Sequence, residues 1–109
     1  MPVMEGIYMT KVLVVDDEKS IREMLEIYLQ REGYAVSCAC DGLDALARCE
    51  QEPFDVVIAD IKMPRMDGIT LLQRVRDFSP HTIFIMITAF ASYETARESM
   101  HEDAYDYIT

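Results

Sequence analysis

Short runs of apolar residues alternate along the chain with stretches in which apolar residues recur every three or four positions. The continuous, β-branched runs are typical of buried strands, and the wider spacing is typical of helices with one buried face. Five strands are predicted on this basis, at residues 11–15, 34–38, 56–59, 83–87 and 105–108. Four helices are predicted between them, beginning near residues 20, 42, 68 and 92, and the first three are ended by Gly33, Pro53 and Pro80.

Local signals define the helices further. Ser20 and Glu23 have the spacing of a capping box at the start of the first helix, and Asp67 is placed to cap the third. The apolar face of the first helix is predicted to carry Ile21, Met24, Leu25, Tyr28 and Leu29. The apolar face of the second helix is predicted to carry Leu43, Leu46 and Ala47.

The order of these elements predicts an α/β fold. Strands that alternate with helices form right-handed crossovers and a parallel sheet with helices on both faces. We therefore expect a doubly wound parallel sheet with the strand order 2-1-3-4-5. Residues 1–9 are predicted to be an N-terminal extension, and residues 10–109 to form one domain.

Composition restricts the function further. The 109 residues are 50% hydrophobic and 28% charged, which suits one folded domain. The formal net charge of -10 would repel a phosphate backbone, so direct binding to nucleic acid is not expected. The chain has neither a long apolar run nor the pattern of a signal peptide, and we expect a cytoplasmic protein without membrane contact. Its three cysteines, Cys38, Cys40 and Cys49, are expected to be reduced packing residues.

Polar residues follow three of the predicted strands. Asp16 and Asp17 follow the first strand, Asp60 ends the third, and Thr88 follows the fourth. In the order 2-1-3-4-5 these strands are neighbours about 4.8 Å apart, so the side chains should converge at one sheet edge. Three carboxylates would repel one another there unless a hard cation such as Mg²⁺ neutralised them.

This convergence suggests chemistry as well as binding. With Mg²⁺ on the paired acids, Asp60 is a candidate nucleophile toward a phosphoryl donor, and the Thr88 hydroxyl could donate to a phosphoryl oxygen. Each acid taken alone has a simpler explanation, as a helix cap or the start of a turn. The functional interpretation therefore depends on the three strand ends lying side by side.

Four segments of the chain form a distinctive set: VLVVDDE, VVIADIKMPRMDG, IMITA and AYDYIT. Together they resemble the receiver domains of response regulators, in particular those attached to sigma-54-type transcription activators, and the resemblance covers residues 10–109. It implies a flavodoxin-like fold in which a histidine kinase phosphorylates Asp60. It also implies that Asp16, Asp17, Asp60 and the backbone carbonyl of Lys62 bind Mg²⁺. Thr88 and an aromatic residue at Tyr107 would switch conformation upon phosphorylation.

The chain departs from the family pattern at its end. Family members have a lysine after the position of Thr109 and then a fifth helix, which this sequence does not include. We therefore expect a fragment of a longer regulator whose C-terminal output domain lies elsewhere. Without the fifth helix, an apolar patch should be exposed on the first and fifth strands, and self-association is expected around the fourth helix and fifth strand.

Three other functions compete with this interpretation. A phosphatase of the haloacid-dehalogenase type also uses an aspartate nucleophile and Mg²⁺, but its acids follow an Asp-x-Asp spacing that differs from Asp16–Asp17. A nucleotide-binding fragment would need a glycine-rich phosphate loop, and none is present. The strongest rival is a pseudo-receiver, which keeps the fold as an interaction module without phosphorylation. A working receiver would catalyse only its own phosphorylation and dephosphorylation, and is not otherwise an enzyme.

Overall fold

The computed structural model describes residues 9–87 and 106–108. The elements along the chain are β1 (Lys11–Val15), α1 (Lys19–Arg31), β2 (Ala35–Ala39), α2 (Gly42–Gln51), β3 (Val56–Asp60), α3 (Gly68–Arg76), β4 (Ile83–Ile87) and β5 (Asp106–Ile108). This alternation agrees with the pattern predicted from the sequence. The helix predicted at residues 92–100 lies outside the described residues.

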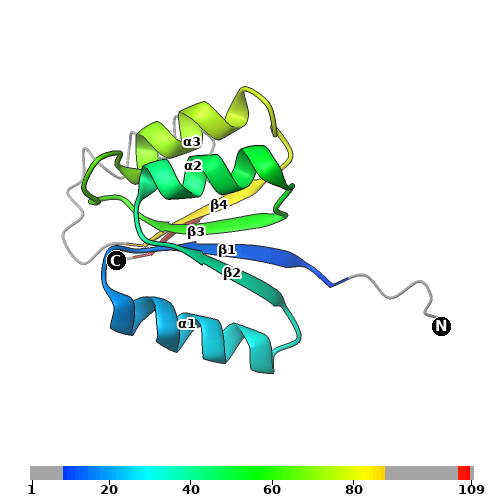
Figure 1. Cartoon of the computed structure of the whole chain (residues 1–109). Coiled ribbons are helices and arrows are strands. Elements are labelled where there is room, and N and C mark those ends of the chain that lie inside the picture. The colour runs from blue at the N-terminus through cyan, green and yellow to red at the C-terminus, as the bar shows by residue number, and fades with distance from the viewer. Residues whose placement is uncertain (1–8, 88–105, 109) are drawn as a thin grey trace.

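The five strands form one parallel sheet in the order β2-β1-β3-β4-β5, which confirms the predicted topology. Helix α1 covers one face of this sheet, and α2 and α3 cover the other (Figure 1). In the register of β1 with β3, Val15 is paired with Ala59. The residues that follow this pair, Asp16 and Asp60, are therefore brought to the same edge of the sheet.

The two faces of the sheet are buried to different extents. On the side of α2 and α3, the strand residues Val57 and Phe84 belong to the same core cluster as Leu72, and all three are 0% exposed. The alternate residues of β3 and β4 on the α1 side, including Ile58 and Ile85, are only half-buried. The helical layer of α2 and α3 therefore supplies the main hydrophobic core.

The prediction of an exposed apolar patch on the first strand is wrong. Residues 12–15 of β1 are at most 2% exposed, because β1 lies in the sheet between β2 and β3 and has helices on both sides. Partial exposure is instead found on the α1 side of β3 and β4. Only the backbone of β5 is described, so the prediction for its surface stays a prediction.

The start of α1 differs from the sequence prediction. The helix begins at Lys19 with Glu18 at the N-cap, so Ser20 lies inside the first turn and the predicted capping box does not form. The turn is already formed by Asp16, whose Oδ1 accepts a hydrogen bond from the Glu18 N–H at 2.9 Å. The Arg22 guanidinium closes the same turn by donating to the Asp16 carbonyl oxygen at 2.8 Å.

The inward face of α1 was only partly predicted. All residues of α1 are described, and none is fully buried. Ile21, Leu25 and Leu29 are half-buried against the sheet, whereas Met24 and Tyr28 are each 60% exposed. The inward stripe of α1 is therefore narrower than the apolar stripe in its sequence.

The predicted face of α2 is correct for Leu46 and wrong for Leu43 and Ala47. Ala45 and Cys49 are buried and Leu46 packs against the core, while Leu43 and Ala47 are exposed. The fully buried residues of α2 are therefore small ones, namely Gly42, Ala45 and Cys49. All three cysteines are free thiols, but the prediction that they are packing residues holds only in part, because Cys49 is buried and Cys40 is exposed. Burial raises the pKa of the Cys49 thiol to about 11.

Gly33 ends α1 through its backbone conformation, as the sequence indicated. It has φ +95, and its N–H donates to the Gln30 carbonyl at 3.1 Å. The Tyr34 N–H donates to the Leu29 carbonyl at 3.1 Å, which completes a Schellman motif. A β-carbon at Gly33 would have open space around it, so the requirement for glycine is purely conformational.

We predict that Gly33→Ala lowers the free energy of unfolding by about 1–2 kcal/mol, because alanine is strained at positive φ. Urea denaturation measures this change. Gln30→Ala, at an exposed position of the same helix end, should change stability by no more than about 0.5 kcal/mol. Equal stability of Gly33→Ala and the parent chain would contradict the assigned conformation.

Candidate functional site

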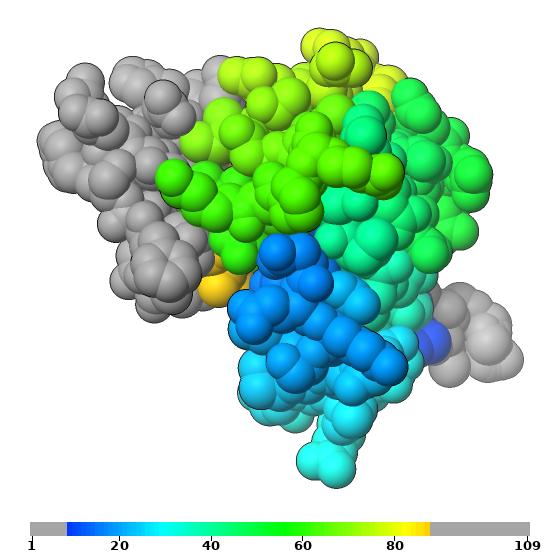
Figure 2. Space-filling model, turned by 60° about the vertical axis from the view of Figure 1, so that its left-hand side comes forward, coloured from blue at the N-terminus to red at the C-terminus, as the bar shows by residue number. Residues whose placement is uncertain are grey.

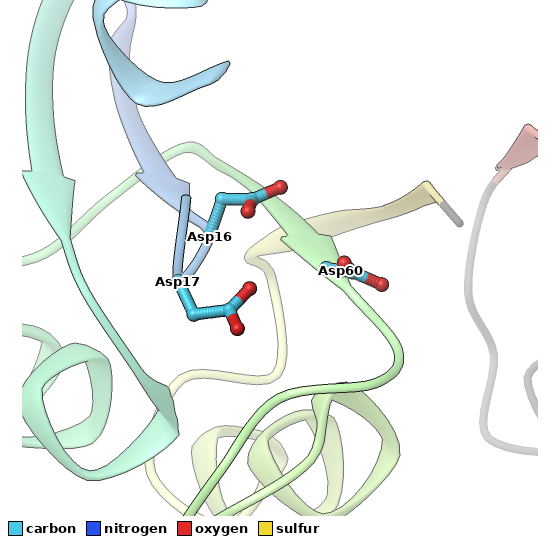
Figure 3. Close-up of side chains that lie close together, drawn as sticks. All are labelled: Asp16, Asp17 and Asp60. Atoms are coloured by element: carbon cyan, nitrogen blue, oxygen red, sulfur yellow. The ribbon is translucent and has the colours of Figure 1, made fainter. Parts of the chain in front are cut away.

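Three aspartates gather at the carboxyl edge of the sheet. Asp16 and Asp17 follow β1, and Asp60 is the last residue of β3 (Figure 3). One carboxylate oxygen from each lies within 4.8 Å of the others. The structure therefore brings together the three acids that the sequence selected as metal-site candidates.

The three carboxylates differ in environment. Asp16 is 8% exposed, Asp17 is exposed, and Asp60 is half-buried. Burial raises the pKa of Asp16, the charges of Asp60 and Asp17 raise it further, and the hydrogen bond from the Glu18 N–H opposes this rise. The cluster thus holds negative charge in a position where a cation would relieve both repulsion and desolvation.

Backbone hydrogen bonds fix the orientation of two of these carboxylates. Asp16 accepts from the Glu18 N–H through Oδ1, and Asp60 Oδ1 accepts from the Lys62 N–H at 3.0 Å. In both cases the donor is two residues further along the chain, so the side chain folds over its own turn. Each carboxylate is therefore held by the backbone of the loop that it begins.

The loop between β3 and α3 is tightly closed. The Gly68 N–H donates to the Ile61 carbonyl at 2.9 Å, and a β-carbon at Gly68 would lie 2.6 Å from the Asp60 carbonyl oxygen. Asp67 caps α3 by accepting from the Thr70 N–H at 2.8 Å, as predicted. Lys62 lies within this loop, and its role as a carbonyl ligand stays a prediction.

The structure does not describe the side chains of two other predicted site residues. Thr88 lies outside the described residues, directly after Ile87, which is paired with Asp60 in the sheet. Tyr107 lies in β5, where its backbone is paired with that of Met86. The roles of both residues stay predictions.

Sequence reasoning missed an ion pair beside the site. Arg65, in the β3–α3 loop, has φ 71 and its Nη2 lies 2.9 Å from Oδ2 of Asp41 at the start of α2. Nothing in the local sequence indicated that Arg65 adopts a left-handed conformation or reaches Asp41.

The cluster is a suitable site for a hard divalent cation such as Mg²⁺, because all three side chains offer carboxylate oxygens. Asp17 is exposed, and backbone hydrogen bonds orient Asp16 and Asp60. Residues 12–109 match the family model of the response regulator receiver domain. The chain belongs to this family.

Individual receiver domains are similar in both sequence and structure. The chain is 40% identical over 97 residues to the transcriptional regulatory protein ZraR of Salmonella typhimurium, covering 89% of this chain and 22% of that protein. The chemotaxis protein CheY4 of Vibrio cholerae has 40% identity and a TM-score of 0.86, covering 92% of this chain and 85% of CheY4.

A response regulator of Burkholderia pseudomallei, solved with a phosphorylated aspartic acid, a calcium ion and citrate, has 28% identity and a TM-score of 0.85. The alignment covers 91% of this chain and 58% of that protein. The receiver domain described here spans about a fifth of the length of the first curated relatives it matches. Within its described residues, no helix has the length and apolar character needed to cross a membrane.

We predict that Asp16→Asn stabilises the metal-free receiver domain at pH 7. Asparagine retains an oxygen that accepts from the Glu18 N–H, but it removes the negative charge of Asp16. The pKa of the Asp16 carboxyl group is raised above 3.8 in the folded state. The charged form destabilises the fold above the folded pKa, so the gain should shrink as the pH falls through that pKa toward 3.8. Urea unfolding in EDTA across this pH range measures the difference.

A control is needed for the change in net charge. Glu50→Gln removes one negative charge from an exposed position on α2 and should change stability by no more than about 0.5 kcal/mol. A gain from Asp16→Asn that matched this control, or that grew at low pH, would refute the assigned cause.

Proposed function

We propose that this receiver domain accepts a phosphoryl group on Asp60 from a histidine kinase, in a reaction that requires Mg²⁺. The observation that supports this most directly is the cluster of three carboxylates at the ends of β1 and β3. Asp60 begins the segment DIKMPRMDG, on which the family resemblance depends most strongly. The phosphorylated aspartic acid of the Burkholderia pseudomallei relative supports the same chemistry.

The residues that would hold Mg²⁺ are Asp16, Asp17, Asp60 and the backbone carbonyl of Lys62. Mg²⁺ prefers oxygen ligands and usually keeps several waters, which suits a partly exposed site. When bound, it would neutralise charge on the carboxylates and on the phosphoryl oxygens. The hydrogen bonds from the Glu18 and Lys62 amides would reduce the cost of ordering two of the ligands.

Asp60 would act as the nucleophile. One of its carboxylate oxygens would form the new bond to phosphorus while the bond from phosphorus to the donor breaks and the donor group leaves with the electron pair. The Lys62 N–H, bonded to Oδ1 of Asp60, would limit rotation of the carboxylate. The product would be an acyl phosphate at the edge of the sheet.

Phosphorylation would then shift the receiver between two conformations. We propose that the Thr88 hydroxyl contacts the phosphoryl group and that Tyr107 responds as the switch aromatic. The register of β3, β4 and β5 supports this, because the carboxyl ends of these three parallel strands lie at the same edge of the sheet. An output domain in the longer protein would receive the signal. This protein would act in the cytoplasm, and it would regulate transcription, as the name of ZraR indicates for that protein.

We predict that incubation with Mg²⁺ and acetyl phosphate adds one phosphoryl group, which increases the intact mass by about 80 Da. The adduct should be released by hydroxylamine, as expected of an acyl phosphate, and should be absent from Asp60→Asn. Asp55→Asn is the matched control. Asp55 lies immediately before β3, at the end opposite to Asp60, and its side chain accepts from the Lys11 N–H at 2.8 Å. A folded parent chain without an adduct would favour the pseudo-receiver function.

We also predict that Mg²⁺ stabilises the folded chain through these acids. At a Mg²⁺ concentration 100 times the dissociation constant, the free energy of unfolding should rise by about 2.7 kcal/mol. Asp17→Asn should lose most of this rise, whereas Asp77→Asn, at the C-cap of α3, should retain it. Denaturation with and without Mg²⁺ measures the rise. An equal rise in Asp17→Asn and the parent would place the cation elsewhere.

A further inference from the structure

The ion pair between Asp41 and Arg65 connects the loop that follows Asp60 to the start of α2. Asp41 uses both carboxylate oxygens: Oδ1 accepts from the Asp44 N–H at 2.8 Å, and Oδ2 lies 2.9 Å from Nη2 of Arg65. The Asp41 side chain is only 10% exposed. The Asp44 N–H lowers the pKa of Asp41, and Arg65 lowers it further against the opposing effect of burial, so the pair is charged at neutral pH.

The backbone of Arg65 makes this contact significant for the loop. Its φ of 71 is unfavourable for a residue with a β-carbon, and a contact elsewhere must offset that cost. The ion pair with Asp41 provides such a contact. Arg65 is also the middle residue of a three-residue turn, because the Met66 N–H donates to the Pro64 carbonyl at 2.8 Å.

Close packing reinforces the connection. A β-carbon at Gly42 would overlap the Met66 carbonyl oxygen and lie 2.6 Å from the Met66 β-carbon. The first residue of α2 and the residue after Arg65 are therefore in direct contact. The surface of the β3–α3 loop, in green, borders the blue-green surface where α2 begins (Figure 2).

The other end of the same loop meets the carboxylate cluster. The Lys62 N–H donates to Asp60 Oδ1, and only three residues separate Lys62 from Met66. One of them is Pro64, which has a fixed φ and accepts from the Met66 N–H at 2.8 Å. Because this segment is so short and constrained, a displacement at Arg65 would also move Lys62.

We infer that Asp41 and Arg65 are positioning residues that hold the Lys62 backbone in register with Asp60, and so set the affinity for Mg²⁺ and the rate of phosphorylation. This inference rests on the proposed function. Neither residue needs to touch the cation or the phosphoryl group. Their effect would act through the loop.

Three variants test the pair. Asp41→Asn keeps an N-cap oxygen for α2 but removes the charge, Arg65→Ala removes the guanidinium, and Arg65→Lys keeps a cation. Arg48→Ala is the matched control, because Arg48 pairs with Asp44 on the exposed surface of α2, with Nε 3.6 Å from Oδ1. The measurements are the Mg²⁺ dissociation constant, the rate of phosphorylation by acetyl phosphate, and hydrogen exchange at the Lys62 amide without metal.

Asp41→Asn and Arg65→Ala should each weaken Mg²⁺ binding by about tenfold, as is typical when support for a metal ligand is lost. Both should slow phosphorylation and speed exchange at the Lys62 amide, and the double variant should be no worse than either single one. Arg65→Lys should retain most of the function, and Arg48→Ala should behave as the parent chain does.

Two results would overturn the inference. One is an unchanged dissociation constant and rate in folded Asp41→Asn and Arg65→Ala. The other is an equal loss in Arg48→Ala. If the parent chain bound no Mg²⁺ and formed no adduct, the proposed function would fail, and exchange at the Lys62 amide would alone decide whether the pair holds the loop.

Discussion

The parallel pairing of β1 with β3 is the constraint on which the rest of the molecule depends. Because Val15 is opposite Ala59, the chain leaves both strands at the same level and in the same direction. The acids that follow must then lie together, whatever their mutual repulsion. The backbone amides of Glu18 and Lys62 hold two of these carboxylates in place, so each loop stabilises the site that it helps to form.

The architecture and the position of the site could be predicted from the sequence because both follow from topology. Buried parallel strands appear as continuous apolar runs, and their order determines which strand ends are adjacent. Asp16, Asp17 and Asp60 were therefore correctly brought together without any knowledge of distances. Gly33 and Asp67 were predictable for a similar reason, since each acts through the backbone next to it.

The errors arose where tertiary contacts overrode local preference. Ser20 has the spacing of a capping residue, but the turn at Asp16 begins α1 earlier. In α2, Gly42 lies close to Met66 and the small residues Ala45 and Cys49 are buried, whereas Leu43 is exposed. Arg65, which has φ 71, pairs with a residue 24 positions earlier in the chain, and a contact at that separation has no local signature.

The unequal burial of the two sheet faces has a consequence for how the molecule opens. Helices α2 and α3 contribute fully buried side chains to the core, whereas α1 contributes half-buried ones and leaves Met24, Ile27 and Tyr28 in contact with water. A helix attached in this way can detach in a partial unfolding event that leaves the rest of the sheet intact. The first acidic turn is joined to α1 through Arg22, so that event would also release the Asp16 backbone. Among the described residues, the conformation of the acidic turn would thus depend on how firmly α1 is attached to the sheet.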